Sequence, residues 1–334
     1  MTRQEEIEQV KIKLEQTTNE REQAEVLVEL LWKYAGLYNL NVQDYIDNLF
    51  SLAKRIHEPI YEAWGLFFQA NQNRLAGEQA KALDRSHRAL SSFTAVNHVK
   101  GMALCYGNLG LIYFDQSNYF DSIKNHSAAL ALKKEIGDEA GVANTYINMA
   151  RCDVALGNYP ESLQYYFNAL KILIELGDRH GIAICHRNIG VNYFEQGNYT
   201  EALKNFVLAQ KQHEEDNNQL GISVGYQNIG NVYLKQGKIS EALDNYYKSL
   251  KIKKELNDKN GMVTLYNSIG TAYGLQGNYE QALKYHFASI QIAGLLGSKE
   301  YIGDAYHEIG NVYLAQKDYT NALKYLTLST EVAT

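Results

Sequence analysis

The sequence predicts an all-α protein, a solenoid of stacked antiparallel helix pairs, and three observations support this fold class. An aliphatic residue followed by a small residue returns every 40 residues, and a tyrosine usually follows three positions later. A fixed period of this size is typical of an array of structural units. Only two prolines, Pro59 and Pro160, occur in 334 residues, which suits long uninterrupted helices. The repeating pairs are Leu109-Gly110, Met149-Ala150, Ile189-Gly190, Ile229-Gly230, Ile269-Gly270 and Ile309-Gly310.

The sequence predicts two helices in each 40-residue unit. In the unit after Gly137, Asp138 is placed to cap a first helix that runs to about Leu156. A glycine follows each first helix at the same position of the repeat, where it can take the left-handed conformation that ends a helix. These glycines are Gly157, Gly197, Gly237 and Gly277. The second helix begins after residues 158–159, with Pro160 in its first turn, and runs to about Leu176.

The repeated glycine lies inside the first helix, where glycine costs about 1 kcal/mol relative to alanine. Its repetition indicates that a second helix approaches closely at this point. We expect the partners to be the small residues of the second helix in the same unit, so that the two helices nest. These residues are Ala202, Ala242, Ala282 and Ala322, with Ser122 and Ser162 in earlier units.

The pattern resembles the tetratricopeptide repeat, with an aromatic residue, an aliphatic-small pair and a second aromatic residue on the first helix. The unit from Tyr226 to Ser249, with Ile229-Gly230, Tyr233, Ala242 and Tyr246, matches nearly every position. Its 40-residue spacing, longer than the usual 34, is similar to Pins-type adaptors and to repeat regions of bacterial signalling proteins. The resemblance implies a right-handed superhelix whose first helices line a concave face.

The resemblance is strong over residues 101–334 and extends to 61–100. We therefore expect seven units, at 61–100, 101–140, 141–180, 181–220, 221–260, 261–300 and 301–334, preceded by divergent capping helices at 1–60. Because no polar capping helix follows the last unit, we also expect a longer polypeptide whose C-terminal part signals.

Composition excludes several classes of function. The net charge of −6 and pI near 5.9 argue against a nucleic-acid-binding protein. The charged N-terminus and the lack of a long apolar run predict a cytoplasmic protein that does not enter membranes. The three cysteines are scattered and predict buried small side chains. The pattern G-x-S-x-G at 221–225 lies at a predicted helix start and not at the strand-to-helix turn that a nucleophile needs, so we expect no catalytic residue. The nine histidines are dispersed along the chain, and we expect no metal and no cofactor.

An asparagine recurs two residues before the small residue, at Asn108, Asn148, Asn188 and Asn228, and Ser268 and Glu308 take its place later. An amide offers a donor and an acceptor, so these side chains suit the backbone of an extended peptide. The alternative is that they tie neighbouring helices together, and both roles can hold.

Neighbouring positions of the first helices are expected to complete a concave groove. Arg151 and Arg187 are its cations, able to grip a carboxylate or, alternatively, to form surface ion pairs. The remaining groove residues are Gln227, Asn231, Asn267 and Asn311.

The leading interpretation is a scaffold that binds a protein or peptide in this groove, as a regulatory or sensory module of a bacterial-type signalling protein. The alternative is the N-terminal regulatory half of an enzyme, such as a nucleotide cyclase, histidine kinase or phosphatase, with its catalytic domain beyond residue 334. Stacking of exposed solenoid ends would give a homo-oligomer, and the sequence does not distinguish this state from a monomer.

Overall fold

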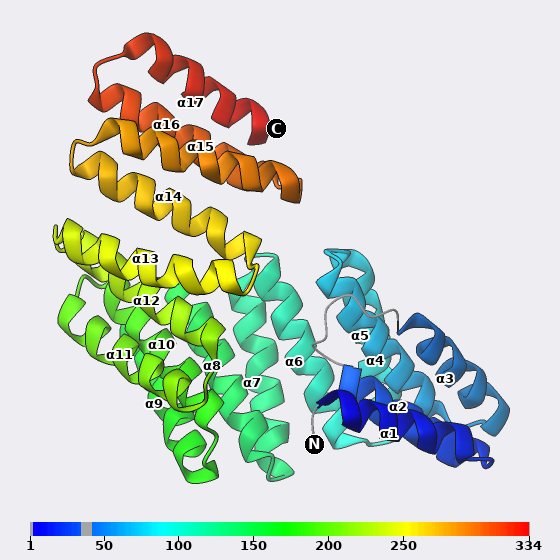
Figure 1. The fold of residues 1–334 in the computed structure, drawn as a ribbon. Helices are drawn as coiled ribbons and strands as arrows, with labels where there is room; N and C mark the ends of the chain where they lie inside the picture. Colours follow the sequence, from blue (N-terminus) through cyan, green and yellow to red (C-terminus); the bar gives the residue numbers. More distant parts are fainter. Residues whose placement is uncertain (1–2, 35–41, 334) are drawn as a thin grey trace. The chain divides into compact units, whose positions relative to one another are not determined.

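The computed structural model describes residues 3–34 and 42–333, which contain 17 α-helices and no strand (Figure 1). Contacts divide the chain into two compact units, Met1–Ile172 and Leu173–Thr334. The all-α prediction is therefore confirmed. Within the described residues, no helix is both long enough and apolar enough to cross a membrane.

In the first unit each helix packs against the next one along the chain from α1 to α8, and α4 with α5 and α6 with α7 form close pairs (Figure 1). The helices are α1 Arg3–Gln16, α2 Glu20–Tyr34, α3 Gln43–Ile56, α4 Pro59–Leu75, α5 Gln79–Ala95, α6 Val99–Asp115, α7 Tyr119–Glu135, α8 Glu139–Ala155 and α9 Tyr159–Leu176, whose last residues belong to the second unit.

In the second unit the close pairs are α10 with α11, α12 with α13, α14 with α15 and α16 with α17, and successive pairs pack together. The helices are α10 Arg179–Glu195, α11 Tyr199–Glu215, α12 Gln219–Lys235, α13 Ile239–Glu255, α14 Lys259–Leu275, α15 Tyr279–Leu296, α16 Lys299–Ala315 and α17 Tyr319–Ala333.

The helix ends follow a period of 20 residues. From residue 57 to residue 317, every twentieth residue has a positive φ, as Gly157 does at 78°. The N–H of the next residue, Asn158, donates to the Asp153 carbonyl at 2.8 Å, which closes a Schellman turn. The following helix is capped by a side chain, as when Asp178 accepts from the Gly181 N–H at 3.0 Å. Two helices with these turns account for the 40-residue repeat, and the predicted helix ends and caps are confirmed.

The repeated glycine has two close neighbours on the second helix of its unit, and only one of them was expected. A Cβ on Gly230 would lie 2.6 Å from Cε1 of Tyr246, whereas Ala242 contributes only its backbone oxygen, at 3.3 Å. The expected approach of the second-helix backbone at Ala242 is therefore confirmed, and the still closer Tyr246 ring is a neighbour that the sequence did not indicate. A helical side chain covers the turn N-terminal to its own Cα, so the residue at 246 leans over the turn that contains Ala242. Glycine makes room for this ring.

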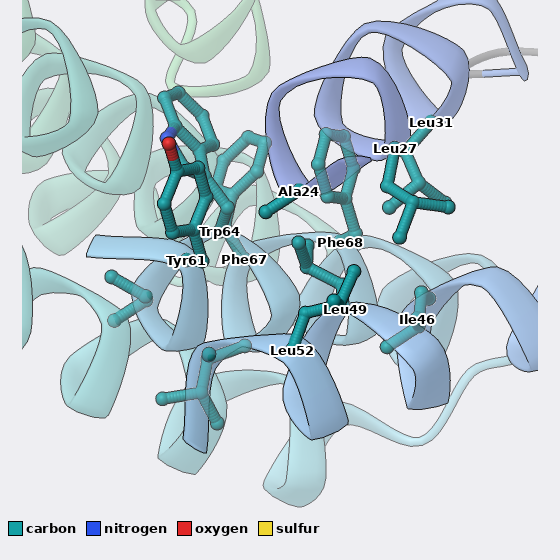
Figure 2. Close-up of a cluster of buried hydrophobic side chains, with 14 of the residues drawn as sticks. Ala24, Leu27, Leu31, Ile46, Leu49, Leu52, Tyr61, Trp64, Phe67 and Phe68 are labelled. Atoms are coloured by element: carbon teal, nitrogen blue, oxygen red, sulfur yellow. The ribbon is translucent and has the colours of Figure 1, made fainter. Parts of the chain in front are cut away.

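The N-terminal helices share a core with the first close pair (Figure 2). Leu27 of α2 and Leu49 of α3 are fully buried beside Trp64 and Phe68 of α4. The Trp64 ring also packs edge-on against Phe93 of α5, with 4.9 Å between centroids. This aromatic core replaces the tyrosine and glycine pattern of the later repeats.

Candidate functional site

In the first unit the predicted groove residues take different environments. Asn108 of α6 is only 3% exposed, and its Nδ2 donates to Ser86 Oγ of α5 at 3.0 Å. This contact ties two successive helix pairs together, as the structural alternative expects. Asn148 of α8 is half-buried. Arg151 is exposed and places its guanidinium carbon 4.5 Å from the centre of the Phe114 ring, a cation–π contact.

In the second unit Arg187 and Asn188 lie side by side on α10, with Arg187 Nη2 donating to Asn188 Oδ1 at 3.3 Å. Arg187 also lines a cavity of about 10 Å³ together with Asn228 of α12 and His213 of α11. That volume suits a single water molecule. Burial, with His180 and Arg187 nearby, lowers the pKa of His213. Gln227 is half-buried on α12 and lines neither this cavity nor the two larger hollows on the same unit.

A larger hollow opens between α12, α14 and α16, with a volume of about 540 Å³. It brings together two of the predicted residues, Asn231 and Asn267. The full lining is Asn231, Leu234, Tyr246, Thr264, Asn267, Ser268, Thr271, Tyr301, Asp304, His307, Glu308 and Ser329. Most of these side chains carry a hydrogen-bonding group, so the surface suits a polar, extended ligand.

Side chains from the second helices orient the two amides. The Tyr246 hydroxyl donates to Asn231 Oδ1 at 2.8 Å, and burial raises the pKa of this phenol, which therefore stays protonated at neutral pH. His286 Nδ1 lies 3.2 Å from Asn267 Oδ1. Because each amide oxygen already has a partner, each NH₂ group remains as a donor for a ligand in the hollow.

A second hollow of about 160 Å³ lies between α14 and α16 and contains the predicted Asn311. It shares Thr271 and Glu308 with the larger hollow, so the two are neighbours. Its complete lining is Thr271, Gly274, Leu275, Tyr279, His286, Glu308, Asn311, Val312 and Ala315.

Sequence reasoning missed several residues of these hollows. Asp304 was not predicted, although it lies four residues before Glu308 and therefore on the same helix face. Thr264 occupies the same register as Asp304 one repeat earlier, so the 40-residue period could have found both. His286 lies on a second helix, and no sequence signal shows that it also reaches the smaller hollow.

The nucleophilic side chains considered from the sequence are inside the helical core. Burial raises the pKa of Cys105 and of Cys185 to about 12, so both remain thiols at neutral pH. Ser223 is buried within α12 and donates to the Leu220 carbonyl at 2.8 Å, in a helix rather than a strand-to-helix turn. In residues 3–34 and 42–333, no group of three or more His, Cys, Asp or Glu is placed to hold a metal ion.

The model of the tetratricopeptide repeat matches residues 101–175, 141–215, 182–255, 222–294 and 261–334. The chain belongs to the tetratricopeptide repeat family. A search of curated proteins found no match. The family assignment confirms the resemblance drawn from the repeated motif, and it covers the part of the array that contains both hollows.

Solved structures show the same fold as this tetratricopeptide protein. The apo form of RapI is 19% identical, with a TM-score of 0.66 over 81% of this chain and 97% of that one. The Rap conjugation gene regulator of plasmid pLS20, in complex with the Phr* peptide, is 14% identical, with a TM-score of 0.61 over 98% and 93%.

A third structure is a signal transduction ATPase with a tetratricopeptide repeat sensor from Pyrococcus horikoshii. It is 15% identical and has a TM-score of 0.70 over 92% of this chain but only 47% of that chain. At these identities the likeness shows the fold alone.

Proposed function

We propose that this chain is a scaffold that binds an extended peptide or protein segment along its first helices. The observation that carries the proposal is the hollow of about 540 Å³ between α12, α14 and α16, which is lined by two oriented amides together with hydroxyl and carboxylate side chains. Peptide backbones present alternating N–H and C=O groups, which amide side chains can bind without regard to sequence. The Phr* complex of the pLS20 regulator supports a peptide as the ligand class.

Within this function, the chain acts as a regulatory or sensory module of a cytoplasmic signalling protein. The quorum sensor NprR and the conjugation regulator, both similar in fold, support the regulatory role. The alternative is a sensor that controls a catalytic domain in the same polypeptide. The Pyrococcus ATPase favours it, because its repeat sensor accompanies further domains. Sequencing the reading frame beyond residue 334 distinguishes these two forms, since only the second requires a catalytic domain there.

Selection from a display library of random linear peptides tests the binding function. We expect the purified chain to enrich a set of related peptides over blank beads. Asn267→Ala should then weaken their binding about 2- to 10-fold, since a neutral hydrogen bond contributes about 0.5–1.5 kcal/mol.

The matched control is Asn245→Ala, on the second helix α13, where, among the residues that the structure describes, Nδ2 donates only to the Glu241 carbonyl at 2.8 Å. It should leave the affinity unchanged. Failure to enrich any peptide, or equal binding by the Asn267 variant and the native chain, would refute the proposed groove.

A further inference from the structure

A buried tyrosine hydroxyl fixes one amide of the larger hollow. Tyr246 is 0% exposed, and its hydroxyl donates to Asn231 Oδ1 at 2.8 Å. Within the described residues this is the only hydrogen bond of that hydroxyl. Turning the Asn231 amide over would bring its NH₂ group to the hydroxyl and leave the buried O–H without an acceptor, which is unfavourable. The amide of Asn231 is therefore held in one orientation.

This orientation leaves the NH₂ group of Asn231 for a ligand. Asn231 is half-buried and lines the hollow of about 540 Å³ between α12, α14 and α16. Its Nδ2 forms no hydrogen bond within the described residues and is not among their buried unpaired atoms, so it remains open to solvent. An NH₂ group has two donors and no acceptor, so Asn231 offers only donors to this hollow.

An asparagine of the same register lacks such a partner. Asn311 lies two repeats after Asn231, and Leu326 takes the position of Tyr246. The Leu326 side chain packs over a glycine in the same way, since its Cγ would lie 2.7 Å from a Cβ on Gly310. It has no polar atom, so no second-helix hydroxyl holds the Asn311 amide. The fixed orientation at Asn231 therefore depends on the residue at 246, and the repeat fold does not impose it.

We propose that Tyr246 is a positioning residue that makes the larger hollow selective, at Asn231, for a hydrogen-bond acceptor such as a backbone carbonyl of the bound peptide. This inference rests on the proposed peptide-binding function and names the group recognised at one point of the groove. A ligand N–H at the same point meets the NH₂ group and is disfavoured. Because Tyr246 is fully buried, it acts through Asn231.

Substitutions that keep the shape of each side chain test the polarity of this contact. Asn231→Asp replaces the donors by acceptors and should weaken binding of the display-selected peptides about 10- to 100-fold. Tyr246→Phe keeps the ring but frees the amide, and should weaken binding about 2- to 10-fold. The matched control is Tyr247→Phe on the same helix, whose hydroxyl lies 2.9 Å from those of Tyr273 and Tyr285 and outside the hollow. It should leave the affinity unchanged.

A coupling measurement separates positioning from packing. Each carbonyl oxygen of a selected peptide is replaced in turn by sulfur, which is a weaker acceptor. One replacement should weaken binding to the native chain, and its effect should shrink in Tyr246→Phe while the effects of the other replacements stay the same. Circular dichroism melting should show that all variants remain folded. Equal or tighter binding by Asn231→Asp, or no carbonyl coupled to Tyr246, would overturn the proposal and leave the peptide-binding function standing.

A second measurement does not depend on any peptide. In ¹⁵N relaxation of the side-chain amides, the NH₂ group of Asn231 should be more ordered than that of Asn311 on the picosecond to nanosecond timescale. Each signal is identified by its loss when that asparagine is changed to aspartate. Tyr246→Phe should make the Asn231 group as mobile as that of Asn311. If no peptide is enriched, the binding function fails, and this measurement alone decides the positioning role. Equal order of Asn231 in the native chain and in Tyr246→Phe would show that the hydroxyl does not hold the amide.

Discussion

Replacing Gly230 by alanine tests how the repeats pack. The new Cβ would lie 2.6 Å from Cε1 of Tyr246, a ring that is 0% exposed. To reach ordinary contact at about 3.4 Å, the ring must move by roughly 0.8 Å in a dense core, and such overpacking costs about 1–3 kcal/mol. Alanine recovers about 1 kcal/mol of helix propensity. We therefore expect a net loss of about 0–2 kcal/mol, and a larger loss for Gly230→Leu.

Gly274→Ala is the matched control in the same unit. Its Cβ would meet only Ala282 Cβ and Val312 Cγ2, both at 3.8 Å, which is ordinary contact. This variant should be stabilised by up to about 1 kcal/mol, because it gains propensity without strain. Urea unfolding followed by far-UV circular dichroism compares the two. The gap between them should be about 1–3 kcal/mol.

Removing the ring provides a second check. In a Tyr246→Ala background the obstacle is absent, so Gly230→Ala should become neutral or stabilising, and the two changes should be strongly non-additive. If Gly230→Ala stabilises the native chain as much as Gly274→Ala does, the ring is not what requires glycine, and the packing explanation fails.

Two further predictions concern the amides and a buried histidine. Changing Asn148, Asn188 and Asn228 together to alanine should weaken peptide binding with a small loss of melting temperature; persistent binding with a collapsed melting temperature would show that they serve only the fold. His126 is buried with both ring nitrogens unpartnered among the described residues, and burial, aided by Lys133 and Arg151, lowers its pKa to about 4. Below pH 6.5 the unfolded state takes up the proton first, so stability should fall as pH drops towards 4, by about 3 kcal/mol at most. His126→Phe should reduce that fall in urea unfolding at pH 7 and pH 4.5; an unchanged pH dependence would contradict it.

The architecture could be predicted from sequence because the residues that begin and end each helix recur at a fixed interval. Caps such as Asp138 and left-handed glycines such as Gly157 act through local backbone geometry, and each recurs at a fixed interval. The ring that covers the repeated glycine was not predictable in the same way. It depends on how a side chain leans along the second helix, and a sequence pattern shows which residues are small but not which ring covers them.

The candidate site was predicted only in part, for a related reason. Asn231 and Asn267 lie on first helices, where the register indicates the groove, and both line the larger hollow. Gln227 satisfied the same register but lines none of the hollows described. Tyr246 and His286 lie on second helices, whose register indicates the core. Each ring packs on a glycine and also places one polar atom against a first-helix asparagine, Tyr246 Oη at Asn231 and His286 Nδ1 at Asn267.

This geometry links the core of a repeat to two asparagines of the first helices. A ring at the 246 register fills the space above the glycine and, when its tip is polar, also holds the oxygen of a neighbouring amide, as at Tyr246–Asn231 and His286–Asn267. Where Phe206 takes that register, its ring meets Gly190 in the same way but offers no polar tip. Asparagines of the first helices are therefore presented with a fixed donor in some repeats and not in others. The core residue at this register therefore sets whether a first-helix asparagine has a hydrogen-bond partner on the second helix of its unit.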